Sequence, residues 1–245
     1  MRGFWMLTWT EWKLYLRNPF AAFFTLIYPV MLIFLFGSIY GNEPRFAGFG
    51  TIDLSVPSYI VLIITTVGSL SLPIHLSTYR ERRILRRLAV TPISPLALLG
   101  AEGLTLFAFT LSGTLLMIVA ARLFYGLRFA GTITSVAVAF VLSCLALFSF
   151  GFLVASLCNS ARMAQAVSFV IFFPMMFLSG AALPREILSE NLRRISVIFP
   201  ATPAVTLLRA TWVGESLRTH LPALGGLLAV WIVSSVLASR LFRWE

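Results

Sequence analysis

The densest group of reactive side chains is the segment YRERRILRRLAVTP at residues 79–92, with five arginines and one glutamate. Guanidinium groups bind carboxylates and phosphates through paired hydrogen bonds. As a helix, the segment separates apolar from charged side chains, and Thr91-Pro92 ends that helix. The apolar face comprises Ile84, Leu85, Leu88 and Ala89, and the charged face comprises Arg82, Arg83, Arg86 and Arg87.

Three roles suit such a segment. It can set membrane topology through its positive charge, bind anionic lipid, or present an apolar ridge with a charged rim to a protein partner. Charge alone does not require the apolar ridge, so the pattern favours a docking helix.

Glu102 is the one formally charged residue within a long apolar stretch of the sequence. An ionisable group in such a place is a functional hypothesis by default. We expect a structural ion pair with an arginine of residues 82–87 or of the N-terminal segment. A proton-relay or substrate-binding role is the alternative.

Other reactive residues form no catalytic or metal-binding pattern. His75 and His220 lie far apart and there is no His-x-x-x-His pair, so we expect no metal site and no catalytic residue. Cys144 and Cys158 are separated by about 21 Å along a helix, which predicts unpaired buried thiols. The only lysine, Lys13, follows no glycine-rich loop, so this chain cannot hydrolyse ATP through a P-loop.

The composition determines which elements position these residues. The chain has 245 residues, 59% of them hydrophobic and 11% charged, with a mean hydropathy of +0.92. A soluble domain does not carry this composition, so the sequence predicts an integral membrane protein. The net charge of +10 then indicates loops that face anionic lipid rather than nucleic acid.

Six apolar stretches, uncharged apart from Glu102, are long enough to cross about 30 Å of hydrocarbon. Backbone groups in lipid must bond internally, so each must be helical. The expected fold is an all-α polytopic membrane protein, with residues 1–245 forming one transmembrane domain. The predicted spans are Phe20–Tyr40, Val56–Leu76, Leu96–Ala121, Gly131–Leu157, Met163–Leu183 and Leu221–Ser239.

Two further segments complete this architecture. Residues 1–19 place Trp5, Trp9 and Trp12 on one helical stripe, which predicts an amphipathic helix in the membrane interface rather than a secretory signal. Residues 184–220 contain two apolar stripes interrupted at Pro200, each too short to span. We expect two short helices that enter or lie on the outer leaflet. The stripes are Ile187, Leu188, Leu192 and Ile195, then Val205, Leu208 and Trp212.

The distribution of basic residues predicts the orientation. With both termini in the cytoplasm, eleven of the 19 Lys and Arg face inward, including those of residues 79–92. Small residues at Gly151 and Ala155 indicate a close helix approach, either within the chain or between two copies.

The segment after the second stretch resembles the membrane subunits of type-2 ABC exporters, the ABC-2 type permeases that include daunorubicin-resistance and nodulation-type proteins. Their pattern there is similar to Glu-Arg, Leu, Arg-Leu, Thr-Pro-hydrophobic-Ser, although Arg83 stands where glycine is common. A second pattern, Phe-Leu-Ser-Gly with a following proline, resembles Phe177, Leu178, Ser179, Gly180 and Pro184. The matching residues of the first pattern are Glu81, Arg82, Leu85, Arg87, Leu88, Thr91, Pro92, Ile93 and Ser94.

The resemblance implies that residues 79–92 form a cytoplasmic coupling helix docked on a separate P-loop ATPase, present in two copies and carrying ATP and Mg. It implies a second permease copy or a related permease, and a path lined by the second and fifth spans at Tyr59, Ile63, Phe172, Phe173 and Phe177. These apolar side chains favour export of a hydrophobic drug-like, lipid or lipid-linked compound across a bacterial plasma membrane. Export of a polysaccharide or glycoconjugate is the alternative, and a proton-coupled transporter or channel is a further one.

Overall fold

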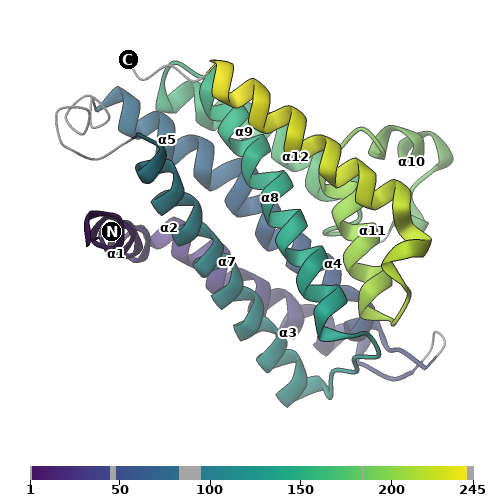
Figure 1. Ribbon diagram of the computed structural model, residues 1–245. Helices are drawn as coiled ribbons and strands as arrows, with labels where there is room; N and C mark the ends of the chain where they lie inside the picture. Colours follow the sequence, from purple (N-terminus) through teal and green to yellow (C-terminus); the bar gives the residue numbers. More distant parts are fainter. Residues whose placement is uncertain (1, 45–47, 83–94, 184, 242–245) are drawn as a thin grey trace.

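The computed structural model describes residues 2–44, 48–82, 95–183 and 185–241. Within these ranges the chain is helical, without β-strands, and six helices are long and apolar enough to cross a membrane (Figure 1). The predicted all-α polytopic fold is therefore confirmed. The observed spans are Phe23–Tyr40, Thr51–Glu81, Gly100–Tyr125, Ile133–Leu157, Ala161–Leu178 and Leu217–Leu241.

Two span boundaries differ clearly from the predicted ones. Span two comprises α4 (Thr51–Thr65), the π-helical turn η2 (Thr66–Ser71) and α5 (Leu72–Glu81), so it extends beyond both predicted ends. An apolar criterion misses these extensions because polar residues continue the helix. The fifth span, α9 (Ala161–Leu178), ends before the predicted Leu183 because Gly180 adopts a left-handed φ of 92°.

Span two is the centre of the fold. In its most apolar stretch 83% of residues are buried, against 22% in the first and fifth spans and 17% in the sixth. Its neighbours include α7 (Pro95–Tyr125), α8 (Ile133–Leu157) and α9. The sixth span, α12 (Leu221–Leu241), runs along α8 (Figure 1). The first, fifth and sixth spans therefore present most of the apolar surface.

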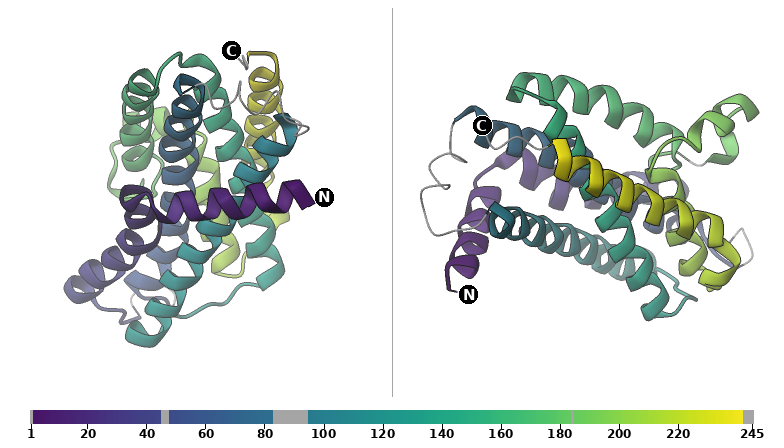
Figure 2. Two further views of the ribbon diagram at one scale, coloured as in Figure 1. Left: turned by 90° about the vertical axis from the view of Figure 1, so that its left-hand side faces the viewer. Right: turned by 45° about the horizontal axis from the view of Figure 1, so that its top comes forward.

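The N-terminal segment forms α1 (Arg2–Leu16), which runs across the bundle and packs against α7 (Figure 2). The Trp12 ring stacks on Phe109 of α7 at a centroid distance of 4.1 Å. Trp5 and Trp9 are exposed, whereas Glu11 is buried. The helix is as predicted, but the tryptophan stripe is divided between an inward-facing Trp12 and two outward-facing rings.

Short helices connect the remaining spans. The helix α2 (Pro19–Ala22) leads into span one, which comprises the π-helical turn η1 (Phe23–Ile27) and α3 (Tyr28–Tyr40). After α9, the 3-10 turn η3 (Arg185–Ile187) leads to α10 (Glu190–Ser196) and α11 (Ala201–Trp212), and η4 (Leu217–His220) precedes α12.

The two predicted short helices between spans five and six are α10 and α11, which meet at a bend of 98°. The second stripe, Val205, Leu208 and Trp212, is buried. It packs against α4, α8 and α12, so α11 is part of the bundle. The first stripe lies on the outside of the fold at Ile187, Leu192 and Ile195.

Both π-helical turns lie against glycines of neighbouring helices. A Cβ at Gly113 of α7 would lie 2.2 Å from the carbonyl oxygen of Thr25 in η1. A Cβ at Gly151 of α8 would lie 1.8 Å from the carbonyl oxygen of Gly68 in η2. The close helix approach expected at Gly151 is thus a contact within the chain, with span two.

Candidate functional site

The predicted coupling segment joins α5 to α7. Of its proposed residues, the structure describes Glu81 and Arg82, which are exposed at the end of α5. The rest lie outside the described residues, namely Arg83, Ile84, Leu85, Arg86, Arg87, Leu88, Thr91 and Pro92. The ends of α5 and α7 that flank this segment lie at the same end of the bundle as α1 and the end of α12 (Figure 1).

One side of the α5 end bonds to the turn between α8 and α9. Arg80 Nη1 donates to the carbonyl oxygens of Cys158 at 2.7 Å and Ala155 at 3.3 Å, at the C-terminal end of α8. Glu81 Oε2 accepts a 2.9 Å hydrogen bond from the backbone N–H of Ala161, which begins α9. A cation at a helix C-terminus and an anion at a helix N-terminus both complement the helix dipole. The end of span two is therefore bonded to spans four and five.

The other side of α5 contacts α1 and α7 through a buried polar cluster. His75 Nδ1 lies 2.8 Å from Glu102 Oε1, and Tyr79 Oη donates to both carboxylate oxygens of Glu11, at 2.8 and 3.0 Å. Glu11, His75 and Glu102 each contribute one potential metal-ligand atom, a carboxylate oxygen or an imidazole nitrogen, and these three atoms lie within 4.8 Å of one another. Glu102 thus pairs with a histidine of span two, where an arginine was expected.

Both carboxylates of this cluster are buried, with Glu11 5% and Glu102 4% exposed. Burial, followed by the charge of Glu102, raises the pKa of Glu11 to about 7. Burial therefore favours the neutral form of Glu11, at the contact between α1 and the two helices that flank residues 83–94.

The five proposed path residues are not on one surface. Tyr59, Ile63 and Phe172 are buried inside the chain, while Phe173 and Phe177 are exposed on α9. Within the described chain, only the α9 pair of this set is therefore open to lipid, cargo or another subunit.

The second motif forms the end of α9. Phe177 and Leu178 close the helix, Ser179 is its buried C-cap residue, and Gly180 makes the left-handed turn. Pro184 lies outside the described residues. The motif is the start of the connection to α10.

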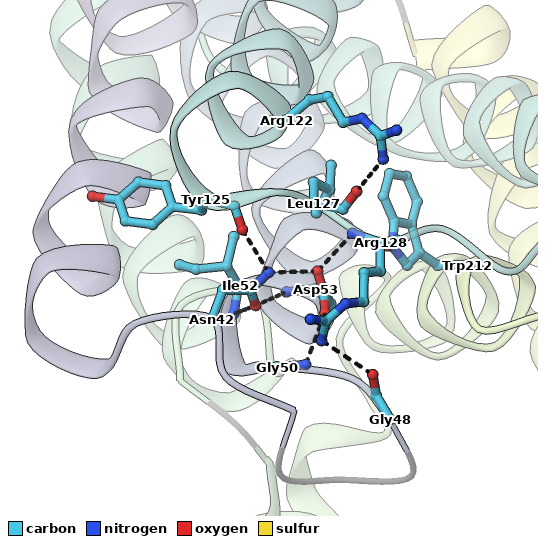
Figure 3. A network of polar contacts seen from close by, with 10 residues as sticks. All are labelled: Asn42, Gly48, Gly50, Ile52, Asp53, Arg122, Tyr125, Leu127, Arg128 and Trp212. Atoms are coloured by element: carbon cyan, nitrogen blue, oxygen red, sulfur yellow. Dashed lines mark hydrogen bonds and ion pairs between the residues drawn. The ribbon is translucent and has the colours of Figure 1, made fainter.

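A second polar network, at the opposite end of the bundle, surrounds Asp53 (Figure 3). Its Oδ1 accepts from Asn42 Nδ2 at 2.9 Å and from the Arg128 backbone N–H at 2.8 Å. Its Oδ2 accepts from the Gly50 N–H at 2.8 Å. Trp212 of α11 joins the network by donating to the Arg128 carbonyl at 3.3 Å. The network connects the loops before α4 and α8 to α11.

Sequence reasoning missed Asp53, although two signals were available. It is the only aspartate in the sequence and it stands directly before an apolar run. Gly50 and Asp53 also have the spacing of a helix-capping pair.

Comparison with known proteins identifies the family of this chain. Residues 2–212 match the family model described as ABC-2 type transporter. The chain belongs to the ABC-2 type transporter family. As an ABC-2 protein with six apolar spanning helices, it is a multi-pass membrane protein.

Two curated relatives are proteins named "Probable multidrug ABC transporter permease YbhR", from Escherichia coli strain K12 and Escherichia coli O157:H7. Each is 27% identical over 191 residues, covering 77% of this chain and 51% of the relative. The chain thus spans about half the length of the curated relatives it matches.

Proposed function

We propose that this chain is the permease subunit of an ATP-binding-cassette exporter, driven by ATP that a separate P-loop ATPase hydrolyses. The family match over residues 2–212 carries this proposal. The only lysine of the sequence lies in α1 and not in a P-loop, which supports ATP hydrolysis by a separate subunit. ATP and Mg would be held by two copies of the ATPase, and no cofactor by this chain.

The contacts at the end of α5 support a route for force into the membrane. Residues 83–94 join α5 to α7 as the ATPase-docking segment. A displacement of this segment would act on α8 and α9 through Arg80 and Glu81, because these two side chains form hydrogen bonds with the end of α8 and the start of α9. It would act on α1 and α7 through His75 and Tyr79. One docking segment would thus shift four helices together.

The exposed face of α9 supports a hydrophobic or lipid-linked cargo. Val170, Phe173 and Phe177 are exposed at helical spacing and form an apolar stripe. The relatives' printed name, multidrug permease, agrees with such a cargo. A second permease copy facing this stripe would enclose a path that six spans alone do not provide. The termini and residues 83–94 would face the cytoplasm of a bacterial cell.

The decisive experiment is reconstitution with and without a P-loop ATPase partner. In liposomes, the chain alone should be idle, and a lipophilic fluorescent cargo should move only when the ATPase and ATP are added. Replacing Leu85 and Leu88 with Asp should abolish co-purification with the ATPase while leaving membrane insertion intact.

A matched control replaces two exposed apolar residues at the other end, Ile195 and Ile198, with Asp. Complex yield should be unchanged in this control. Vigorous transport by the chain alone would contradict the proposal and favour a proton-coupled transporter or channel. Movement of a glycoconjugate instead of the lipophilic probe would assign the alternative cargo.

A further inference from the structure

Three potential metal ligands from three different helices converge beside the coupling segment. Glu11 belongs to α1, His75 to α5 and Glu102 to α7, and their donor atoms are all within 4.8 Å of one another. Two ligand atoms on one tetrahedral Zn²⁺ lie about 3.3 Å apart, from metal–ligand distances of about 2.0–2.1 Å. One pair here, His75 Nδ1 and Glu102 Oε1, is separated by 2.8 Å, and no pair of the three ligand atoms is farther apart than 4.8 Å. Side-chain rotations that bring the three atoms to about 3.3 Å from one another would enclose an ion.

The charge of the cluster favours a cation. Two carboxylates are buried there, and among the described residues neither forms an ion pair with a lysine or arginine. Buried carboxylates are costly unless a positive charge compensates them, and the cluster's own cation is His75 when it is protonated beside Glu102. A divalent ion would balance both negative charges while leaving the imidazole neutral, as a metal ligand must be.

The donor set specifies the kind of ion. One imidazole nitrogen and two carboxylate oxygens suit a divalent transition metal such as Zn²⁺, since imidazole is a poor ligand for Mg²⁺ or Ca²⁺. Tyr79 Oη donates to both oxygens of Glu11, which is the outer-shell support that orients a ligating carboxylate. The His75 side chain is 25% exposed, so an ion has a route from solvent.

We propose that Glu11, His75 and Glu102 form a binding site for one divalent transition-metal ion, which clasps α1 to the two helices flanking the coupling segment. The inference is independent of the transported cargo. It departs from the sequence-based expectation of no metal site, which rested on the absence of a local histidine pair. The ligands here come from positions 11, 75 and 102 and meet only through the fold.

The test uses the purified chain in detergent, stripped with a chelator and titrated with Zn²⁺ by calorimetry, with bound metal counted by mass spectrometry. One Zn²⁺ per chain should bind, and His75→Asn or Glu102→Gln should weaken binding by about 100-fold or more. The matched control is His220→Asn, which removes the other histidine and its exposed contact with Glu215. This control should bind Zn²⁺ as the wild type does.

X-ray absorption of the Zn²⁺-loaded wild type provides a readout that requires no variant. It should show a shell of oxygen and nitrogen with one imidazole. Two imidazoles, or sulfur from Cys158, would place the ion elsewhere and overturn the proposal. Absence of saturable binding, or binding that survives both His75→Asn and Glu102→Gln, would overturn it as well.

Discussion

Gly151 of α8 lies directly against the backbone of Gly68 in span two, where an added Cβ would stand 1.8 Å from the Gly68 carbonyl oxygen. The carbonyl belongs to backbone and cannot rotate away as a side chain would. The most buried span and α8 are therefore in contact at a point that excludes every residue except glycine.

Gly151→Ala should consequently destabilise the protein by about 3 kcal/mol, at the upper end of overpacking costs. The measurement is the thermal unfolding midpoint in detergent, followed by size-exclusion chromatography. Gly225→Ala in α12 is the matched control, since nothing lies within 4 Å of its added Cβ. It should be neutral or stabilise by about 0.5–1 kcal/mol. Equal stability of the two variants would show that the α8 contact is looser than described.

Asp53 is fully buried and accepts hydrogen bonds from three donors in two loops, the one before α4 and the one before α8. Asp53→Asn replaces one accepting carboxylate oxygen with an NH₂ group that faces N–H donors, so we expect the unfolding free energy to fall by about 1–3 kcal/mol. The same thermal measurement applies. Glu190→Gln, in an exposed pair with Arg194, should change stability by less than about 1 kcal/mol. An Asp53→Asn variant with the stability of the wild type would mean that the network is not formed.

Glu81 contributes its carboxylate to the first turn of α9 through the Ala161 N–H. Glu81→Ala removes a helix-capping acceptor worth about 0.5–2 kcal/mol. Hydrogen–deuterium exchange should accelerate at the start of α9 and remain unchanged in α12. Glu215→Ala, at the opposite end of the bundle, should leave the α9 amides as in the wild type. If the amides at the start of α9 exchange in Glu81→Ala as they do in the wild type, the proposed connection between the coupling segment and span five is wrong.

We expect the stability of the protein to depend on pH through Glu11, at the contact of α1 with α5 and α7, when a chelator removes metal ions. Its pKa is about 7 in the fold against an ordinary 4.5, so its stabilising, protonated form is complete below about pH 4.5 and lost as pH rises through 7. The groups facing it are Glu102, His75 and Tyr79. Unfolding free energy should fall by about 3 kcal/mol between about pH 5 and pH 8.

The matched variant for this titration is Glu11→Gln, which keeps the size of the side chain and does not titrate. Its stability should be much less sensitive to pH over that interval. Parallel loss of stability in the wild type and in Glu11→Gln would assign the effect to another group.

Hydropathy alone predicted the six spans, because a span must satisfy its backbone internally and expose apolar side chains to lipid. The two short helices after α9 were also predictable, since Pro200 separates two stripes that are each too short to cross. What periodicity could not predict is which stripe is buried. Val205 and Leu208 pack into the bundle while Ile187 and Ile195 do not, and this depends on the neighbours that α11 meets.

The polar contacts were less predictable than the spans. Glu102 was singled out from the sequence, yet its partner His75 lies 27 residues away on another helix, and nothing local indicates the pairing. Glu11 lies off the tryptophan stripe of α1, and docking of α1 on α7 buries it. The role of the coupling residues 83–92 stays a prediction, as does that of the proposed path residues.

The π-helical turn η2 divides span two into α4 and α5, and α5 leads to residues 83–94. A π turn accommodates one residue more than the regular helix around it. Were its bonds to revert to the α pattern, everything beyond it would swivel by about 100°, the angle of one residue. Such a rotation would separate the polar side chains of α5 from their partners on α1, α7, α8 and α9 at the same time, so the contacts of α5 depend on the register that this one turn of backbone sets.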